Sequence, residues 1–176
     1  MQAGVRGREG LGLSKLLVDS MCGRLTRWLR MIGVDADYLR DADDAQLIAK
    51  ARSEGRVLVT RDVGLHGRAL KEGVQAILLR SPNLTEQLAQ VVSWLGCEPV
   101  VIPDYSRCPD CNSPLRKASK EEVEGLVPEG SFKAHSEFWR CTGCGKVYWR
   151  GKHFNDIERV LSEVRELAAR SEGLKH

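Results

Sequence analysis

Two cysteine pairs restrict the fold of this chain more than any other feature of its sequence. The pairs are Cys108/Cys111 and Cys141/Cys144. Cysteines at this spacing can share one tight turn and point both sulfurs at one ion, and two such turns complete the tetrahedral sulfur shell that zinc prefers. Disulfide bonds and a redox pair are the alternatives, but there is no secretory leader and neither pair opens a helix after a strand. We therefore predict a structural zinc site with no open coordination position.

The sequence around these cysteines differs in character from the rest of the chain. Between residues 105 and 152, prolines and glycines replace regular hydrophobic periodicity. This pattern is typical of a small module that a metal ion helps to hold together. Gly143 and Gly145 fit the tight backbone of the second cysteine turn, where we expect positive φ. We predict a zinc ribbon over residues 105–152.

Residues 153–176 are predicted to form one C-terminal helix. Its apolar residues recur at helical spacing: Phe154, Ile157, Val160, Leu161, Val164 and Leu167. Asn155 and Glu158 are placed as a capping box at its start. An apolar stripe of this kind needs a partner surface, so we expect the helix to pack against the preceding domain.

Short apolar runs alternate with helical segments before the cysteine pairs. The predicted strands are 16–18, 36–39, 57–60, 76–79 and 100–102, and the predicted helices are 22–32, 43–54, 65–72 and 83–95. Such alternation indicates an α/β fold with a parallel sheet flanked by helices, here over residues 15–104. Residues 1–14 are rich in glycine and aperiodic, and we predict that they form a flexible leader.

Composition narrows the choice of environment and partner only slightly. The formal net charge of +3 is too small to indicate a nucleic-acid partner by itself. No apolar run approaches the roughly 18 residues needed to cross a bilayer, so we expect a cytoplasmic protein with no membrane contact.

Aspartates follow the predicted strands where a parallel sheet would bring them together. Asp19 follows the first strand and Asp62 the third, while Asp43 and Asp44 open the helix after the second. Carboxylates that converge on one sheet edge repel one another unless cations lie among them, and Mg²⁺ or Mn²⁺ prefers such ligands. Ordinary helix capping is the alternative, because Asp43 and Gln46 also form a capping-box pattern.

Three segments carry a resemblance to a known family. They are Asp19-Ser-Met-Cys-Gly-Arg-Leu-Thr-Arg-Trp-Leu-Arg-Met-Ile-Gly33, Asp43-Asp-Ala-Gln-Leu-Ile48 and Leu58-Val-Thr-Arg-Asp62. They resemble the PIN-like RNase family named for the C-terminal domain of the Mut-seven exonuclease. The cysteine pairs and Tyr148-Trp-Arg-Gly-Lys-His153 are similar to the C-terminal zinc ribbon of that family.

This resemblance implies a function and a set of catalytic residues. It makes Asp19 the first acid and Asp62 the third, with Asp44 or its neighbour Asp43 as the second. Thr60 falls in the threonine-x-aspartate element. PIN-type nucleases often have a fourth acid, to which no residue of this sequence is assigned. The implied activity is hydrolysis of RNA phosphodiester bonds with Mg²⁺ or Mn²⁺ held by the acids.

Arginines near the acids are candidates for binding the RNA. Arg24, Arg27 and Arg30 lie opposite the apolar side of the first helix, and Arg61 precedes Asp62. Next to an acidic edge they could contact phosphates, although a solvated helix face is the simpler interpretation. The alternative for the whole chain is a non-catalytic adaptor that binds nucleic acid or protein through its zinc ribbon.

Overall fold

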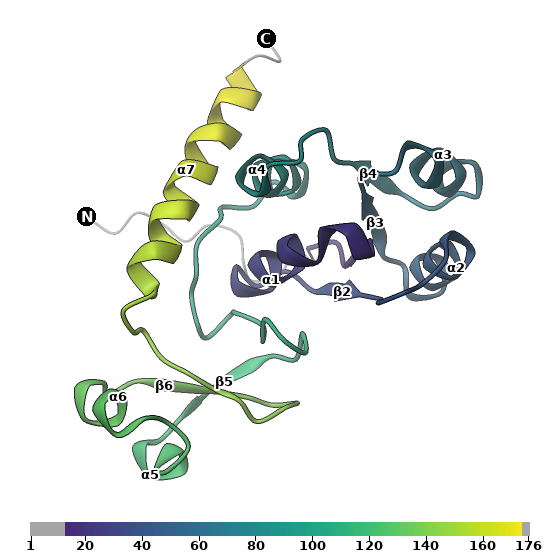
Figure 1. The fold of residues 1–176 in the computed structure, drawn as a ribbon. Coiled ribbons are helices and arrows are strands. Elements are labelled where there is room, and N and C mark those ends of the chain that lie inside the picture. Colours follow the sequence, from purple (N-terminus) through teal and green to yellow (C-terminus); the bar gives the residue numbers. More distant parts are fainter. Residues whose placement is uncertain (1–12, 174–176) are drawn as a thin grey trace.

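A computed structural model describes residues 13–173. The predicted leader of residues 1–14 therefore falls almost entirely outside the described residues. Figure 1 shows a layered α/β domain, a small antiparallel sheet below it, and a long C-terminal helix along one side. We call the small sheet and its connecting helices, residues 105–152, the cysteine ribbon.

The α/β domain is built on a four-stranded parallel sheet in the order β2-β1-β3-β4. Its strands are β1 (Leu16–Val18), β2 (Ala36–Tyr38), β3 (Val57–Thr60) and β4 (Ala76–Leu78). β1 and β3 are buried along their whole length. Continuous apolar strands of this kind are typical of parallel sheets covered on both faces. The predicted fold class is confirmed.

Helices cover both faces of the sheet. They are α1 (Gly23–Met31), which follows a 3-10 turn η1 (Ser20–Cys22), α2 (Asp44–Glu54), α3 (Val63–Lys71) and α4 (Leu84–Leu95). Leu16 and Val18 of β1 pack with α1 and α4, whereas Leu17 packs with α2 and α3 (Figure 1). The alternation follows from the two-residue period of a strand. By the same period, residues 19 and 60 belong to the face of the sheet that α2 and α3 cover.

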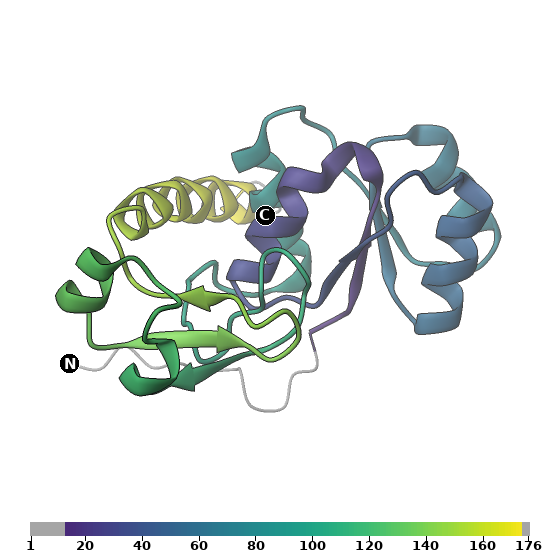
Figure 2. The ribbon, with the colours of Figure 1, turned by 60° about the horizontal axis from the view of Figure 1, so that its bottom comes forward.

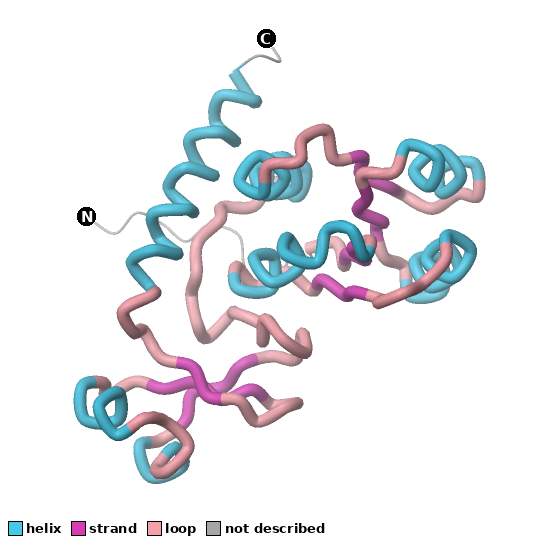
Figure 3. Tube along the Cα trace, in the orientation of Figure 1, coloured by secondary structure: helices cyan, strands magenta, loops and turns pink. Residues whose placement is uncertain are grey.

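The predicted strand at residues 100–102 is wrong. After α4 the chain leaves the sheet as an extended loop that leads to the cysteine ribbon (Figure 3). Val101 packs against the hydrophobic core beside α1 and α4, and the carbonyl of Pro99 accepts a hydrogen bond from Arg165. The apolar run that the sequence pattern assigned to the sheet therefore packs against helices instead.

The cysteine ribbon has its own sheet and its own small core. Its elements are β5 (Leu115–Ala118), α5 (Lys120–Val123), α6 (Glu129–Ala134), β6 (Phe138–Cys141) and β7 (Val147–Tyr148). The three strands are antiparallel in the order β5-β6-β7 (Figure 2). Phe138 is fully buried and lies against Phe132 and Trp149. Ala118 and Val123 complete the buried part of this core.

The C-terminal helix α7 (Phe154–Gly173) packs on α4, as Figures 1 and 2 both show. Leu161 and Val164 are fully buried in the core shared with α1 and α4. The predicted capping box is wrong, because α7 begins at Phe154 and places Asn155 inside its first turn. Within the described residues, the helices are too short or too polar to cross a bilayer.

Candidate functional site

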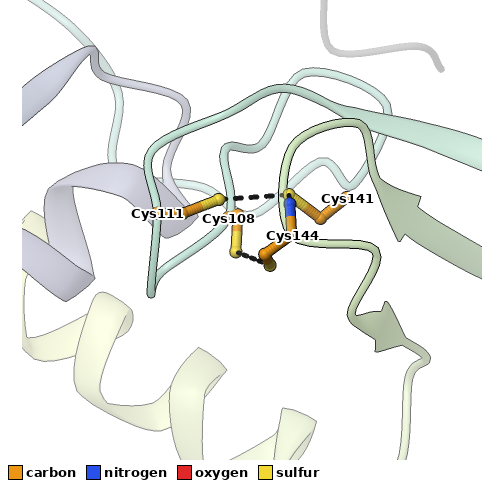
Figure 4. Close-up of side chains that lie close together, drawn as sticks. All are labelled: Cys108, Cys111, Cys141 and Cys144. Carbon is orange, nitrogen blue, oxygen red and sulfur yellow. Dashed lines mark hydrogen bonds between the residues drawn. The ribbon is translucent and has the colours of Figure 1, made fainter.

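The four cysteines of the two pairs form one compact group. Their sulfurs all lie within 4.8 Å of one another (Figure 4). The Sγ atoms of Cys108 and Cys144 are 3.7 Å apart, and those of Cys111 and Cys141 are 3.3 Å apart. Sulfurs at about 2.3 Å from a tetrahedral zinc ion would lie about 3.8 Å from one another. The four cysteines could therefore bind one zinc ion.

Hydrogen-bond donors surround these sulfurs. The backbone N–H groups of Gly143 and Cys144 point at the Cys141 sulfur, at 3.3 and 3.4 Å. The Tyr148 hydroxyl lies 3.1 Å from the Cys108 sulfur. Donors to sulfur stabilise the thiolate form and hold the ligand in place. These donors therefore help to hold the sulfurs of Cys141 and Cys108 in place.

The glycines of the second cysteine turn have two different roles. Gly145 has a φ of 76°, as predicted for the exit from the turn. Gly143 instead allows close packing, since a Cβ atom there would lie 2.3 Å from the Ser113 hydroxyl. Burial raises the pKa of the Cys111 thiol, but hydrogen bonds with Ser113, Cys141 and Cys108 together outweigh it and lower the pKa to about 6.

Arg30 joins the first cysteine turn to the α/β domain. Its side chain is buried at 7% exposure. Nε donates to the carbonyl of Ala36 at 2.7 Å, and one terminal nitrogen donates to the carbonyls of Pro109 and Asp110 at 2.9 and 3.2 Å. The prediction that Arg30 binds RNA is therefore wrong. The ribbon covers this side of α1, so the guanidinium satisfies backbone carbonyls instead of phosphates.

Asn112 makes a second connection between the two parts. Its side-chain amide donates to Asp35 at 2.8 Å and accepts from the Ala36 N–H at 3.3 Å. Asp35 also accepts from Arg56 at 2.8 Å. Burial raises the pKa of Asp35, but the hydrogen bonds from Arg56 and Asn112 outweigh it and hold the pKa below its ordinary value.

Replacing Asn112 with glycine should weaken this connection without straining the backbone. Asn112 has a φ of 67°, which glycine adopts readily, so the substitution removes only the side chain. We expect the free energy of unfolding to fall by about 1–2 kcal/mol, because Asp35 and the Ala36 N–H lose a partner. Asp41→Gly is the matched control, since Asp41 has a φ of 54° in an exposed turn. Urea unfolding of the zinc-loaded protein measures both, and equal effects would exclude a specific role for Asn112.

The predicted acids lie at the carboxyl-terminal edge of the parallel sheet. Asp19 follows β1 and is buried at 6% exposure. Its carboxylate accepts from the Thr60 hydroxyl at 2.8 Å and from the Ser20 hydroxyl at 3.2 Å. The Thr60 oxygen in turn accepts from the Asp62 N–H at 2.9 Å. Thr60 therefore links the first and third predicted acids.

No cationic side chain pairs with Asp19 among residues 13–173, whereas the half-buried Asp35 and Asp37 each have such a partner. Asp35 pairs with Arg56, and Asp37 pairs with Lys50 at 3.0 Å. A buried carboxylate is costly unless it is paired or fully hydrogen-bonded. Two neutral hydroxyls compensate the Asp19 charge only in part.

The remaining acids cap helices at the same edge. Asp62 is exposed and accepts from the Leu65 N–H at 2.8 Å, and Asp43 forms the predicted capping box with Gln46. Asp44 lies 3.5 Å from Arg68, a residue that sequence reasoning did not single out. In the described part of the chain, the cysteines are the one group of three or more ligand atoms within 4.8 Å. Asp19, Asp44 and Asp62 share one edge of the sheet, but their carboxylates do not form so compact a group.

The other predicted arginines are exposed. Arg24 and Arg27 lie on α1, and Arg61 lies between β3 and α3. Arg27 forms an ion pair with Asp110 at 3.2 Å, with 62% of its side chain exposed. All three are accessible to an anionic ligand, which at Arg27 would compete with Asp110.

The fold and site define a two-part protein, in which a parallel α/β domain with an acidic edge carries a four-cysteine ribbon. Residues 14–161 match the sequence model of the Mut7-C RNAse domain, and the chain belongs to this family. The human "Exonuclease mut-7 homolog" is 22% identical over 228 residues, a match that covers 87% of this chain and 26% of that protein. No solved structure matches the chain. Family membership agrees with the resemblance seen in the sequence and indicates a nuclease-type function.

Proposed function

We propose that this chain hydrolyses RNA phosphodiester bonds with Mg²⁺ or Mn²⁺ held at the acidic edge. The observation that carries the proposal is the environment of Asp19, a buried carboxylate that has two hydroxyl partners and, within residues 13–173, no cationic side chain paired with it. A hard divalent ion with carboxylate ligands would balance this charge. The matched RNase family and the human relative described as an exonuclease support the same class of reaction.

Each acid has a distinct role in this proposal. Asp19 and Asp62 supply ligand oxygens, and Thr60 orients Asp19 by donating its hydroxyl proton. Asp44 joins them by exchanging its ion pair with Arg68 for the metal ion. Asp43 caps α2 as Asp62 caps α3, and it is the alternative for this second position. A bound ion would supply an activated water and neutralise charge on the phosphodiester.

We further propose a division of labour between the two parts. Residues 15–104 form the PIN-like nuclease domain, and residues 105–152 form a ribbon whose zinc is structural, because four sulfurs leave no open position. Residues 153–176 attach the ribbon to the nuclease domain through α7. The tight sulfur group and its N–H donors support this role for the ribbon.

The Asp44–Arg68 ion pair favours the alternative, a nucleic-acid-binding module without turnover, because it already neutralises one acid. Loss of RNA with and without added Mn²⁺ separates the two functions. We expect cleavage only when Mn²⁺ is present. Chelators should be left out, because they would also remove zinc from the ribbon. RNA binding with no divalent-dependent loss would support the alternative.

Arg27→Ala should weaken RNA binding and reduce its salt dependence. One lost phosphate contact lowers the slope of log affinity against log salt by about 0.7 for a single strand. Arg52→Ala is the matched control, because Arg52 is similarly exposed and forms one surface ion pair, with Glu72 at 2.8 Å. Titrations at several salt concentrations measure both slopes. Equal slopes for the two variants would show that the charge of Arg27 acts only through the net charge of the protein.

A further inference from the structure

A cavity of about 530 Å³ lies between α1, the cysteine ribbon and the first turn of α7. Much of its lining is aromatic, and the side chains come from all three elements: Trp28, Trp139, Tyr148, Trp149 and Phe154. Except for Trp139, which is buried, these side chains are partly exposed. The volume is within the range of small-ligand pockets. The cavity can therefore accept a flat apolar group.

The charged residues that line the cavity are all basic in the described part of the chain. Arg24, Arg27, Arg107 and Arg150 contribute to it, and no aspartate or glutamate of residues 13–173 does. Arg27 and Arg107 already contact carboxylates, whereas Arg24 and Arg150 have no ion pair within residues 13–173. Arg150 lies over the Phe154 ring, with its guanidinium carbon 5.1 Å from the centroid. The lining thus combines flat rings with positive charge, which complements a base joined to a phosphate.

The cavity also connects to the acidic edge along one helix. Arg24, Arg27, Trp28 and Met31 of its lining are spaced as one face of α1. That helix spans about 13 Å and begins shortly after Asp19, across the turn η1. A nucleic-acid strand held in the cavity could therefore continue along α1 to the acids.

We propose that this cavity binds a base of single-stranded RNA, stacked on its aromatic side chains, while Arg24 and Arg150 hold the adjacent phosphates. Stacking on aromatic rings is tolerant of base identity, so the cavity recognises a single strand and not a particular sequence. Bases in a duplex are already paired and stacked and cannot enter. The inference rests on the proposed function, because it names where the RNA substrate is held.

Binding should be measured with zinc-loaded, full-length protein carrying Asp62→Asn, so that the RNA is not consumed. The probes are a ten-nucleotide oligouridine, the same backbone without bases, and an RNA duplex of equal length. We expect the oligouridine to bind about tenfold more tightly than the abasic strand. A 5-iodouridine version should crosslink to the peptide that holds Trp28 or to the 148–154 segment. Equal affinity for the two strands, or a crosslink confined to other peptides, would overturn the proposal.

Two substitutions test the parts of the cavity separately. Trp28→Leu keeps apolar volume but removes the flat ring, so oligouridine should bind about tenfold more weakly while the abasic strand is unaffected. Trp94→Leu, at an exposed position on α4, is the control and should change neither. Arg24→Ala combined with Arg150→Ala should weaken both strands and lower the salt slope by about 1.4. Equal loss for both strands in Trp28→Leu contradicts stacking.

These results separate the cavity from the catalytic proposal. The abasic and crosslinking comparisons need no variant of the cavity. They therefore test whether the cavity binds a base even if Trp28→Leu fails to fold. If the wild-type chain does not cleave RNA but binding remains base-dependent at the cavity, the nuclease proposal fails and the cavity proposal stands. If cleavage depends on Asp62 but binding is independent of bases, the cavity proposal fails alone.

Discussion

Replacing Asp62 with asparagine is expected to abolish RNA cleavage while leaving RNA affinity unchanged or slightly stronger. The substitution removes a proposed metal ligand together with a negative charge that repels phosphate. A metal ion contributes several kcal/mol to charge stabilisation in the transition state, so the loss should be on the order of 100-fold or more. The amide oxygen of asparagine can still cap α3 at the Leu65 N–H. The fold should therefore survive.

Asp19→Asn should give the same loss for a related reason. The amide keeps the shape of the buried carboxylate beside Thr60 but cannot balance a divalent ion. Asp156→Asn, on the exposed surface of α7, is the control for the loss of one negative charge. The decisive assay is single-turnover cleavage of a mixed RNA pool in Mn²⁺ by identically prepared proteins. Equal rates for wild type and Asp62→Asn would end the nuclease assignment.

The second large effect concerns the cysteine ribbon. We expect one zinc ion per chain, and we expect Cys108→Ser or Cys141→Ser to unfold the ribbon. Structural zinc can contribute on the order of 10 kcal/mol to such small modules. Metal analysis of the purified protein and circular dichroism measure the two outcomes. Cys97→Ser is the control, because Cys97 lies outside the ribbon in a half-buried position.

The contacts between the two parts lead us to expect that zinc removal also affects the α/β domain. We expect this domain to keep its fold after zinc removal, since its core lies around the parallel sheet. Its melting temperature should nevertheless fall, because Arg30 and Asp35 would lose their partners in the first cysteine turn. A zinc content well below one ion per chain with four intact thiols would exclude the predicted site. An unchanged melting temperature would show that the two parts are independent.

The sequence alone was sufficient where the controlling interactions are local. Four of the five predicted strands and all helices of the α/β domain form within a few residues of their predicted ends. The capping box of Asp43 with Gln46 and the left-handed Gly55 that ends α2 depend only on nearby backbone groups. The cysteine spacing predicted one compact group of sulfurs because each pair lies on one turn.

The acidic edge shows where local information ends. Strand direction places Asp19 and Asp62 at one edge, and that much follows from a parallel sheet. The hydrogen bonds that join them through Thr60, and the ion pair of Asp44 with Arg68, depend on how β1, β3, α2 and α3 pack. These contacts are long-range, and no periodicity in the sequence encodes them.

Tertiary structure alone decided what covers each helix. A helical pattern separates the apolar side of α1 from the side that carries Arg30, but it does not show that the cysteine ribbon buries this second side. The same packing leaves the apolar run at 100–102 outside the sheet and creates the aromatic cavity between α1, the ribbon and α7. The sequence by itself determined most helices and strands of the α/β domain, the cysteine group and the family. Their docking depended on side-chain contacts between segments some 80 residues apart, such as that of Arg30 with Asp110, which only the folded chain brings together.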